Sequence, residues 1–171
     1  MQESPESNLA MMTEVIREAE SMLAAQLSAA LASDQRALVF AGLLAATTAA
    51  IASGGIALIL QNQHIWMGIM AMIIAGVMII AVGLAMYAAR PIGFEFSGNR
   101  PREWAADILA CRPLADCLRE QAEHYNEMID ANLACMKQNG QYLKAAMLIC
   151  ALDLAIGGAI FVGLLICLGI S

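Results

Sequence analysis

The sequence predicts an all-α integral membrane protein with three transmembrane helices and two amphipathic cytoplasmic helices. Of its 171 residues, 60% are hydrophobic and only 14% are charged, whereas about a quarter of the residues in a typical soluble domain are charged. No Asp, Glu, Lys or Arg lies between Arg36 and Arg90, and Asp153 is the one charged residue from Ala145 onward. Such stretches suit a bilayer core about 30 Å thick, which takes helices of about 20 apolar residues.

The N-terminal segment, residues 1–36, predicts the first amphipathic cytoplasmic helix. Ser4 is the expected N-cap, and Pro5 suits the first helical position. Apolar residues recur at helical spacing and form one stripe, which consists of Leu9, Met12, Ile16, Ala19, Leu23, Leu27 and Leu31. Because no Pro or Gly occurs from Glu6 to Ala41, we expect this helix to continue into the membrane.

Residues 37–89 predict a transmembrane hairpin. The first span covers residues 37–60 and the second covers residues 65–89, and both are almost entirely apolar. A short polar turn at residues 61–64 joins them. A connection this short makes the two spans antiparallel neighbours.

Residues 90–142 predict a cytoplasmic connector and helix, and residues 143–171 predict the third transmembrane helix. The connector, residues 91–101, is dense in Pro, Gly, Ser and Asn and is expected to be a loop. Helix resumes near Pro101, is interrupted at Pro113 and continues from there into the third span. Its apolar stripe consists of Leu118, Ala122, Tyr125, Ile129, Leu133 and Met136.

The two apolar stripes have three possible neighbours. They can pack on each other as an antiparallel or crossed pair of the coiled-coil type, or each can meet a copy of itself in an oligomer. The N-terminal stripe can also lie on the membrane surface, but its polar face is acidic and anionic lipid would repel it.

The distribution of basic residues predicts the orientation. All nine Lys and Arg residues fall on one side of the membrane, eight of them outside the spans and Lys144 at the entry of the third span. The positive-inside rule then places the N-terminus and residues 90–142 in the cytoplasm and the C-terminus in the periplasm of a bacterial inner membrane.

Composition and motifs argue against several classes of function. A net charge of −6 with scattered basic residues does not favour nucleic-acid binding. The sequence contains no P-loop, GxGxxG, HExxH or GxSxG motif, so we expect no enzyme, no catalytic residue and no cofactor. The spacing of Cys111, Cys117 and His124 matches no standard zinc site, and free thiols rather than a metal site are expected.

Asp153 is the main candidate site residue. It lies nine positions beyond Lys144, or about 13 Å along a helix, inside the hydrocarbon layer. A charged side chain near the membrane centre costs roughly 3 kcal/mol. Thr47 and Thr48 are expected at a similar depth, so a hydrogen bond between the first and third spans is possible. Asp153, Thr47 and Thr48 thus form a candidate intramembrane polar site, which either ties two helices together or lines a proton or ion path.

Small residues predict close helix packing in the spans. They recur at helical spacing in three sets, which are Ala41, Ala45, Ala49 and Ser53; Gly68, Gly76 and Gly83; and Ala151 and Ala155.

Two stretches resemble the transmembrane effector domains of bacterial Pycsar-type anti-phage systems. Asp34-Gln35-Arg36-Ala37 resembles the opening of that domain, and the segment from His124-Tyr125 through Asn132 and Asn139 to Leu143-Lys144-Ala145-Ala146 is similar to its closing segment. The resemblance covers about a fifth of the chain. It implies an effector that assembles and impairs the bilayer when a signal arrives. The sequence shows no cyclic-nucleotide-binding domain, so a signal would have to come through a partner.

The residues and the resemblance together favour a non-enzymatic, self-assembling inner-membrane protein with a possible membrane-perturbing effector role. Its expected partners are the lipid bilayer and either copies of itself or another membrane protein. Two alternatives stay open, namely an accessory or assembly subunit of a larger membrane complex and a small proton or ion carrier that uses Asp153.

Overall fold

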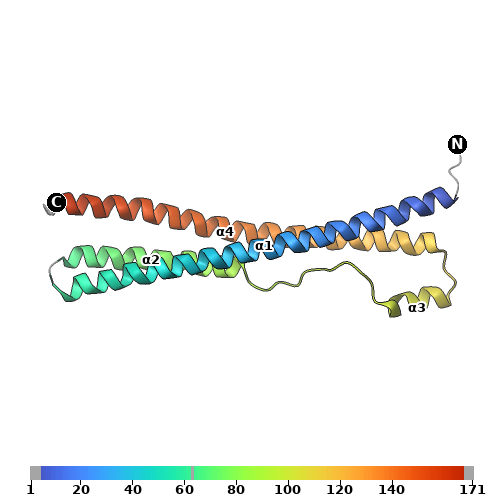
Figure 1. Cartoon of the computed structure of the whole chain (residues 1–171), viewed down its shortest axis with the longest axis horizontal. Helices are drawn as coiled ribbons and strands as arrows, with labels where there is room; N and C mark the ends of the chain where they lie inside the picture. The colour runs from blue at the N-terminus through green and yellow to red at the C-terminus, as the bar shows by residue number, and fades with distance from the viewer. Residues whose placement is uncertain (1–4, 63, 168–171) are drawn as a thin grey trace. The chain divides into compact units, whose positions relative to one another are not determined.

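The computed structural model describes residues 5–62 and 64–167, and Figure 1 shows their helices. The helices are α1 (Pro5–Leu60), α2 (Ile65–Ala88), α3 (Pro101–Leu109) and α4 (Leu114–Cys167). The described residues form no strand, so the predicted all-α class is confirmed. Helices α1, α2 and α4 are each long and apolar enough to cross a membrane. The predicted cap Ser4 and the predicted end of the third span, residues 168–171, lie outside the described residues.

The helix boundaries follow the prolines and the polar turn. Helix α1 runs for 56 residues without a break, as the lack of Pro and Gly in its first half predicts. Pro101 occupies the start of α3, where its missing N–H costs nothing. Pro113 precedes α4 and cannot continue a helix from the preceding turn.

The chain divides into two compact units. We call residues up to Ala32 together with Pro91–Lys137 the connector unit, and Ser33–Arg90 together with residues from Gln138 onward the hairpin unit. Helices α1 and α4 each contribute to both units.

The two predicted amphipathic segments pack on each other in the connector unit. Leu23 of α1 forms a buried cluster with Tyr125, Met128 and Ile129 of α4. Ile16 and Ala19 of the predicted stripe pack against this cluster. This contact is the one expected if the two apolar stripes pack on each other.

Part of each predicted stripe is wrong. Leu31 and Leu133 are exposed, whereas Gln26 and Asn132 are buried at the corresponding turns. Each predicted stripe advanced by two consecutive four-residue steps at this point. A four-residue step turns an α-helix by about 40° beyond a full turn, so the second step leaves the buried face.

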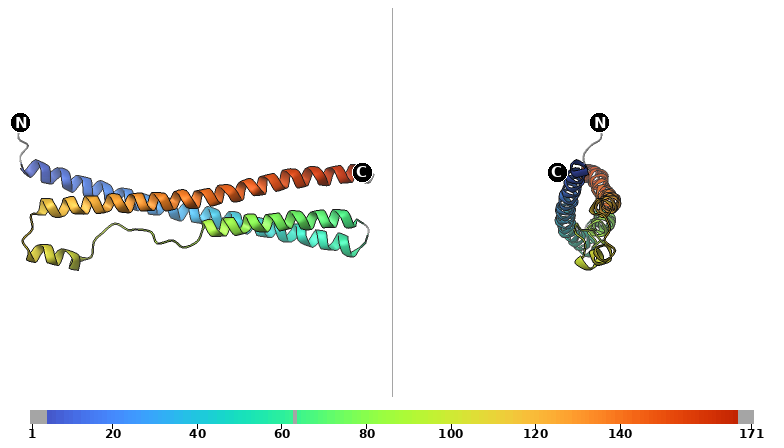
Figure 2. Two further views of the ribbon diagram at one scale, coloured as in Figure 1. Left: turned by 180° about the vertical axis from the view of Figure 1, so that it is seen from behind. Right: turned by 90° about the vertical axis from the view of Figure 1, so that its right-hand side faces the viewer.

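Two amide side chains hold the connector against α4. The Asn132 side chain, which is 2% exposed, accepts a hydrogen bond from the Glu95 N–H (3.0 Å) and donates one to the Glu95 carbonyl (3.1 Å). Asn99 donates to the Gln121 side-chain carbonyl at 3.1 Å. The segment expected as a loop is therefore fixed in place by side chains, and Figure 2 shows it running beside the first half of α4.

Tyr125 joins three segments of the connector unit. Its hydroxyl accepts a hydrogen bond from the Gly98 N–H (3.0 Å) and donates one to the Glu20 carboxylate of α1 (3.1 Å). Gly98 has a φ of +106°, a conformation that side chains rarely adopt. Burial raises the pKa of the Tyr125 hydroxyl above its ordinary value.

Small residues form the interior of the hairpin unit. Ala41, Ala85 and Ala146 make one buried cluster between α1, α2 and α4, and Leu44, Met78, Ala81 and Cys150 make another. The two helices of the hairpin are in close contact at Gly55 and Gly68. A Cβ atom on Gly68 would lie only 2.7 Å from the Gly55 carbonyl oxygen, so this contact requires glycine.

The predicted small-residue faces are only partly buried. Ala41 and Gly68 pack inside, but Ala45, Ala49 and Ser53 of α1 are exposed, as are Gly76, Gly83, Ala151 and Ala155. The buried positions of α1 within the hairpin unit are instead Ala37, Ala41, Leu44, Thr48 and Gly55. Residues of an α-helix that face one neighbouring helix are spaced alternately three and four positions apart. The predicted set of α1, which begins at Ala41, advanced by four positions each time, so its later members turn away from the neighbouring helices.

Candidate functional site

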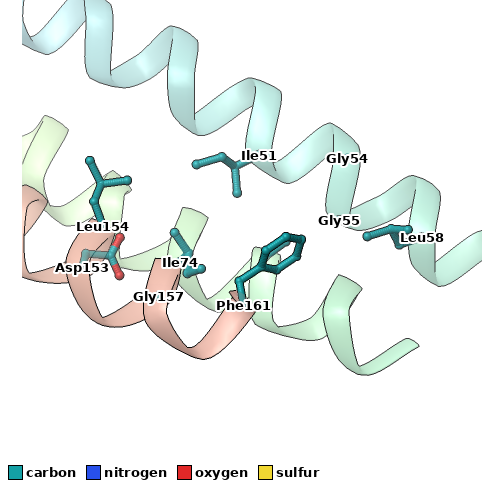
Figure 3. Close-up of a pocket in the computed structure, with 11 residues that line it drawn as sticks. Ile51, Gly54, Gly55, Leu58, Ile74, Asp153, Leu154, Gly157 and Phe161 are labelled. Carbon is teal, nitrogen blue, oxygen red and sulfur yellow. The ribbon is translucent and has the colours of Figure 1, made fainter. Parts of the chain in front are cut away.

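The main candidate site is a pocket in the hairpin unit. It encloses about 350 Å³, and Figure 3 shows the side chains around it. Its lining consists of Ile51, Gly54, Gly55 and Leu58 of α1; Ala71 and Ile74 of α2; and Asp153, Leu154, Gly157, Gly158 and Phe161 of α4. Asp153 is the only charged residue in this lining.

The inner face of α4 brings Asp153 to the pocket. This face carries Ala146, Cys150, Asp153 and Gly157 at successive spacings of four, three and four residues, and all of them except Asp153 are buried. Gly157 fixes the close approach of α4 to α2, because a Cβ atom there would lie 2.6 Å from the Ile74 Cδ1 atom. Figure 3 shows Asp153, Gly157 and Phe161 along α4, with Ile51 and Leu58 of α1 across the pocket.

One oxygen atom of the Asp153 carboxyl lacks a hydrogen-bond partner. Its Oδ2 atom is buried and makes no hydrogen bond. The sequence offers no neutralising cation either, because residues 37–89 and 145–171 contain no Lys or Arg. Buried polar atoms are usually hydrogen-bonded, and each exception asks for an explanation.

Thr47 and Thr48 do not supply that partner. Their hydroxyls donate to the carbonyls of Leu43 (2.9 Å) and Leu44 (2.7 Å) in their own helix. Thr48 is buried, Thr47 is exposed, and neither lines the pocket. A threonine within a helix often satisfies its hydroxyl four residues back, and here this local bond replaces the expected bond between spans.

A second, smaller pocket lies in the connector unit. It encloses about 180 Å³ and is lined by Asn99, Glu103, Trp104, Asp107, Cys117, Glu120, Gln121 and His124. Arg112 forms hydrogen bonds with Asp107 (2.9 Å) and Glu120, and its bond to Glu120 lowers the pKa of that carboxyl. Two of the three carboxylates are thus already paired.

The part of the chain that the structure describes contains no group of three or more His, Cys, Asp or Glu side chains placed to hold a metal ion. Cys117 and His124 line the smaller pocket, but Cys111 is an exposed free thiol that does not. Cys117, Cys135 and Cys150 are free thiols as well.

Comparison with known proteins adds no further assignment. No protein-family model matches the chain, and no curated protein or solved structure is significantly similar to it. The function must therefore be argued from the residues of this chain.

Two features of the sites were missed by sequence reasoning, although the sequence carried a signal for each. The Gly54-Gly55 pair of α1 lines the pocket that contains Asp153. Gln121 and Asn132 are polar residues placed three to four positions from stripe residues of α4. A polar residue on an otherwise apolar helix face predicts a specific buried hydrogen bond.

Proposed function

We propose that the chain is an integral protein of the bacterial inner membrane that assembles with copies of itself. In this proposal the hairpin unit lies in the bilayer, and the connector unit lies in the cytoplasm. The C-terminus is on the periplasmic side.

The placement of large and small side chains in the hairpin unit supports this proposal most directly. Leu43, Ile79 and Leu148 are 65%, 62% and 60% exposed, whereas Ala41, Ala85 and Ala146 are at most 5% exposed. An apolar surface this extensive is unfavourable in water. In a bilayer the large residues are solvated by lipid tails, and the small residues allow the helix backbones to approach.

The charge pattern supports the orientation. Eight of the nine Lys and Arg residues lie outside the spans and Lys144 lies at the entry of the third, whereas the turn at residues 61–64 has no charged residue. A short uncharged turn crosses a membrane at little cost, whereas basic segments stay in the cytoplasm.

The exposed small-residue face of α1 supports self-assembly. Ala45, Ala49 and Ser53 recur every four residues and are all exposed in the single chain. Small residues at this spacing let two helices pack closely in lipid. We assign this face to the contact between copies.

The assembly is tested by its mass in lipid nanodiscs or mild detergent. The wild-type chain should form an oligomer, and Ala49→Leu should weaken it because leucine holds the backbones apart. The matched control is Ala159→Leu, which enlarges an exposed alanine of α4. A monomeric wild-type chain would remove self-assembly. A stoichiometric foreign protein that copurifies would favour an accessory subunit instead.

The resemblance to Pycsar-type effector domains adds a membrane-perturbing role to the proposal. Induced expression should then depolarise the inner membrane, as reported by a membrane-potential dye. Ala49→Leu should reduce the depolarisation in step with the loss of oligomer. An unchanged potential at high expression would remove this role.

A second candidate function is the transport of protons or small ions through the Asp153 site. The unpartnered Oδ2 atom in an apolar pocket favours it. Flux into vesicles that contain the protein is the direct assay. If Asp153→Asn leaves the flux unchanged, the carboxyl does not carry the ion.

A further inference from the structure

We propose that the Asp153 pocket binds a lipophilic monovalent cation, meaning an apolar molecule that carries one positive charge. This inference goes beyond self-assembly, and it rests on the part of the proposed function that places the hairpin unit in a bilayer. The observations that carry it are the charge of the pocket, its shape and its composition.

The charge argument starts from the unmet carboxyl oxygen. Oδ2 of Asp153 has no hydrogen-bond partner, and residues 37–89 and 145–171 contain no Lys or Arg. A neighbouring copy would bring the same residues, so self-assembly supplies no cation from another span. Either a proton on the carboxyl or a positive charge on a bound molecule then neutralises Asp153, and the pocket beside it has room for the second.

The volume and the lining of the pocket point to an organic cation. A volume of about 350 Å³ falls within the range of small-molecule sites. Apart from Asp153, the lining residues are aliphatic, aromatic or glycine. Ca²⁺ and Mg²⁺ need six or more oxygen ligands or bound waters, which one carboxyl in an apolar pocket does not provide. An apolar body with one charge fits both the walls and Asp153.

Equilibrium dialysis with tetraphenylphosphonium tests the proposal. The full chain is placed in nanodiscs of phosphatidylcholine, and empty nanodiscs give the background that arises from partition into lipid. Tetraphenylborate, an anion of the same shape, serves as the charge control. Comigration of the protein with the nanodisc is measured first, so that a failure of membrane insertion is separated from a failure of cation binding.

Two pairs of variants separate charge from space. Asp153→Asn should weaken tetraphenylphosphonium binding by at least about tenfold, whereas Asp130→Asn, at an exposed position of the connector unit, should not change it. Gly158→Leu should also weaken binding because its side chain fills the pocket. Gly163→Leu is the matched control, since both glycines have open space at the Cβ position and only Gly158 lines the pocket.

Three results would overturn the proposal. One is wild-type binding no stronger than in empty nanodiscs. Another is equal binding of the cation and the anion. The third is an Asp153→Asn variant that binds the cation as tightly as the wild-type chain, which is the result expected if Asp153 holds only a proton.

Discussion

Replacing Asn132 by leucine should release the connector from α4 without unfolding the rest of the connector unit. The substitution removes both hydrogen bonds to the Glu95 backbone. Each such bond contributes about 0.5–1.5 kcal/mol, so the connector should lose about 1–3 kcal/mol of local stability. Leucine is apolar and of similar size, and it can stay in the buried position that Asn132 occupies.

Hydrogen–deuterium exchange of the full chain in detergent measures this change. Since 1.4 kcal/mol corresponds to a tenfold change in an equilibrium constant, the Glu95 amide should exchange about 5- to 150-fold faster in Asn132→Leu. Amides around Leu23 should change little, because the buried cluster that contains it does not include Asn132. Asn126→Leu is the control, as Asn126 lies exposed on the same helix. Unchanged exchange at Glu95 in Asn132→Leu would refute the role assigned to this side chain.

Three further predictions concern other contacts. Gly68→Ala should lower the free energy of unfolding of the hairpin unit by about 1–3 kcal/mol, because the added Cβ atom collides with the Gly55 carbonyl oxygen. Gly76→Ala is the control, since a Cβ atom there meets open space. Equal melting temperatures of the two variants would contradict the close approach at Gly68. Burial raises the pKa of the Tyr125 hydroxyl. The stability that this hydroxyl contributes is therefore fully present below its ordinary pKa and is lost as the pH rises through its pKa in the folded chain. Tyr125→Phe should remove this loss of stability at alkaline pH in a series of denaturation measurements, and the same loss in the variant would contradict the prediction. Arg112 lowers the pKa of the Glu120 carboxyl. The ionised carboxyl therefore stabilises the fold above its ordinary pKa, and this stabilisation is lost as the pH falls through its pKa in the folded chain. Arg112→Gln should raise the Glu120 pKa in an NMR titration, and an unchanged pKa would exclude the bond between Arg112 and Glu120.

The helix boundaries could be predicted well because local residues set them. Pro101 and Pro113 allow helix only on one side of themselves, and the structure begins α3 and α4 at Pro101 and Leu114. The lack of Pro and Gly from Glu6 to Ala41 likewise predicted that α1 continues into the membrane span without a break. These signals act over one or two turns and need no knowledge of the neighbouring helices.

The buried faces were harder to predict because they depend on the neighbouring helix. Ala41 is buried, but Ala45 and Ala49 on the same predicted stripe are exposed. Small residues show that a helix can approach another closely, and they do not say which of its faces does so. The phase of the contact comes from tertiary packing.

The candidate site was predicted in part for the same reason. Asp153 stood out because it is the one charged residue in a long apolar stretch. The expected bond to the Thr pair is absent from the described contacts because a hydroxyl four residues from a carbonyl finds a nearer acceptor in its own helix. The pocket beside Asp153 depends on three helices at once, so no local pattern in the sequence could define it.

Labelling of single cysteines with a membrane-impermeant maleimide tests the central claim, which is that the hairpin unit crosses the inner membrane with the connector unit in the cytoplasm. In a variant without its native cysteines, Gln61→Cys marks the hairpin turn and Ser97→Cys marks the connector, and both positions are exposed. We predict that intact spheroplasts label only Gln61→Cys and that Ser97→Cys reacts after the membrane is opened. Labelling of Ser97→Cys in intact spheroplasts, or recovery of the chain in the soluble fraction, would contradict the account.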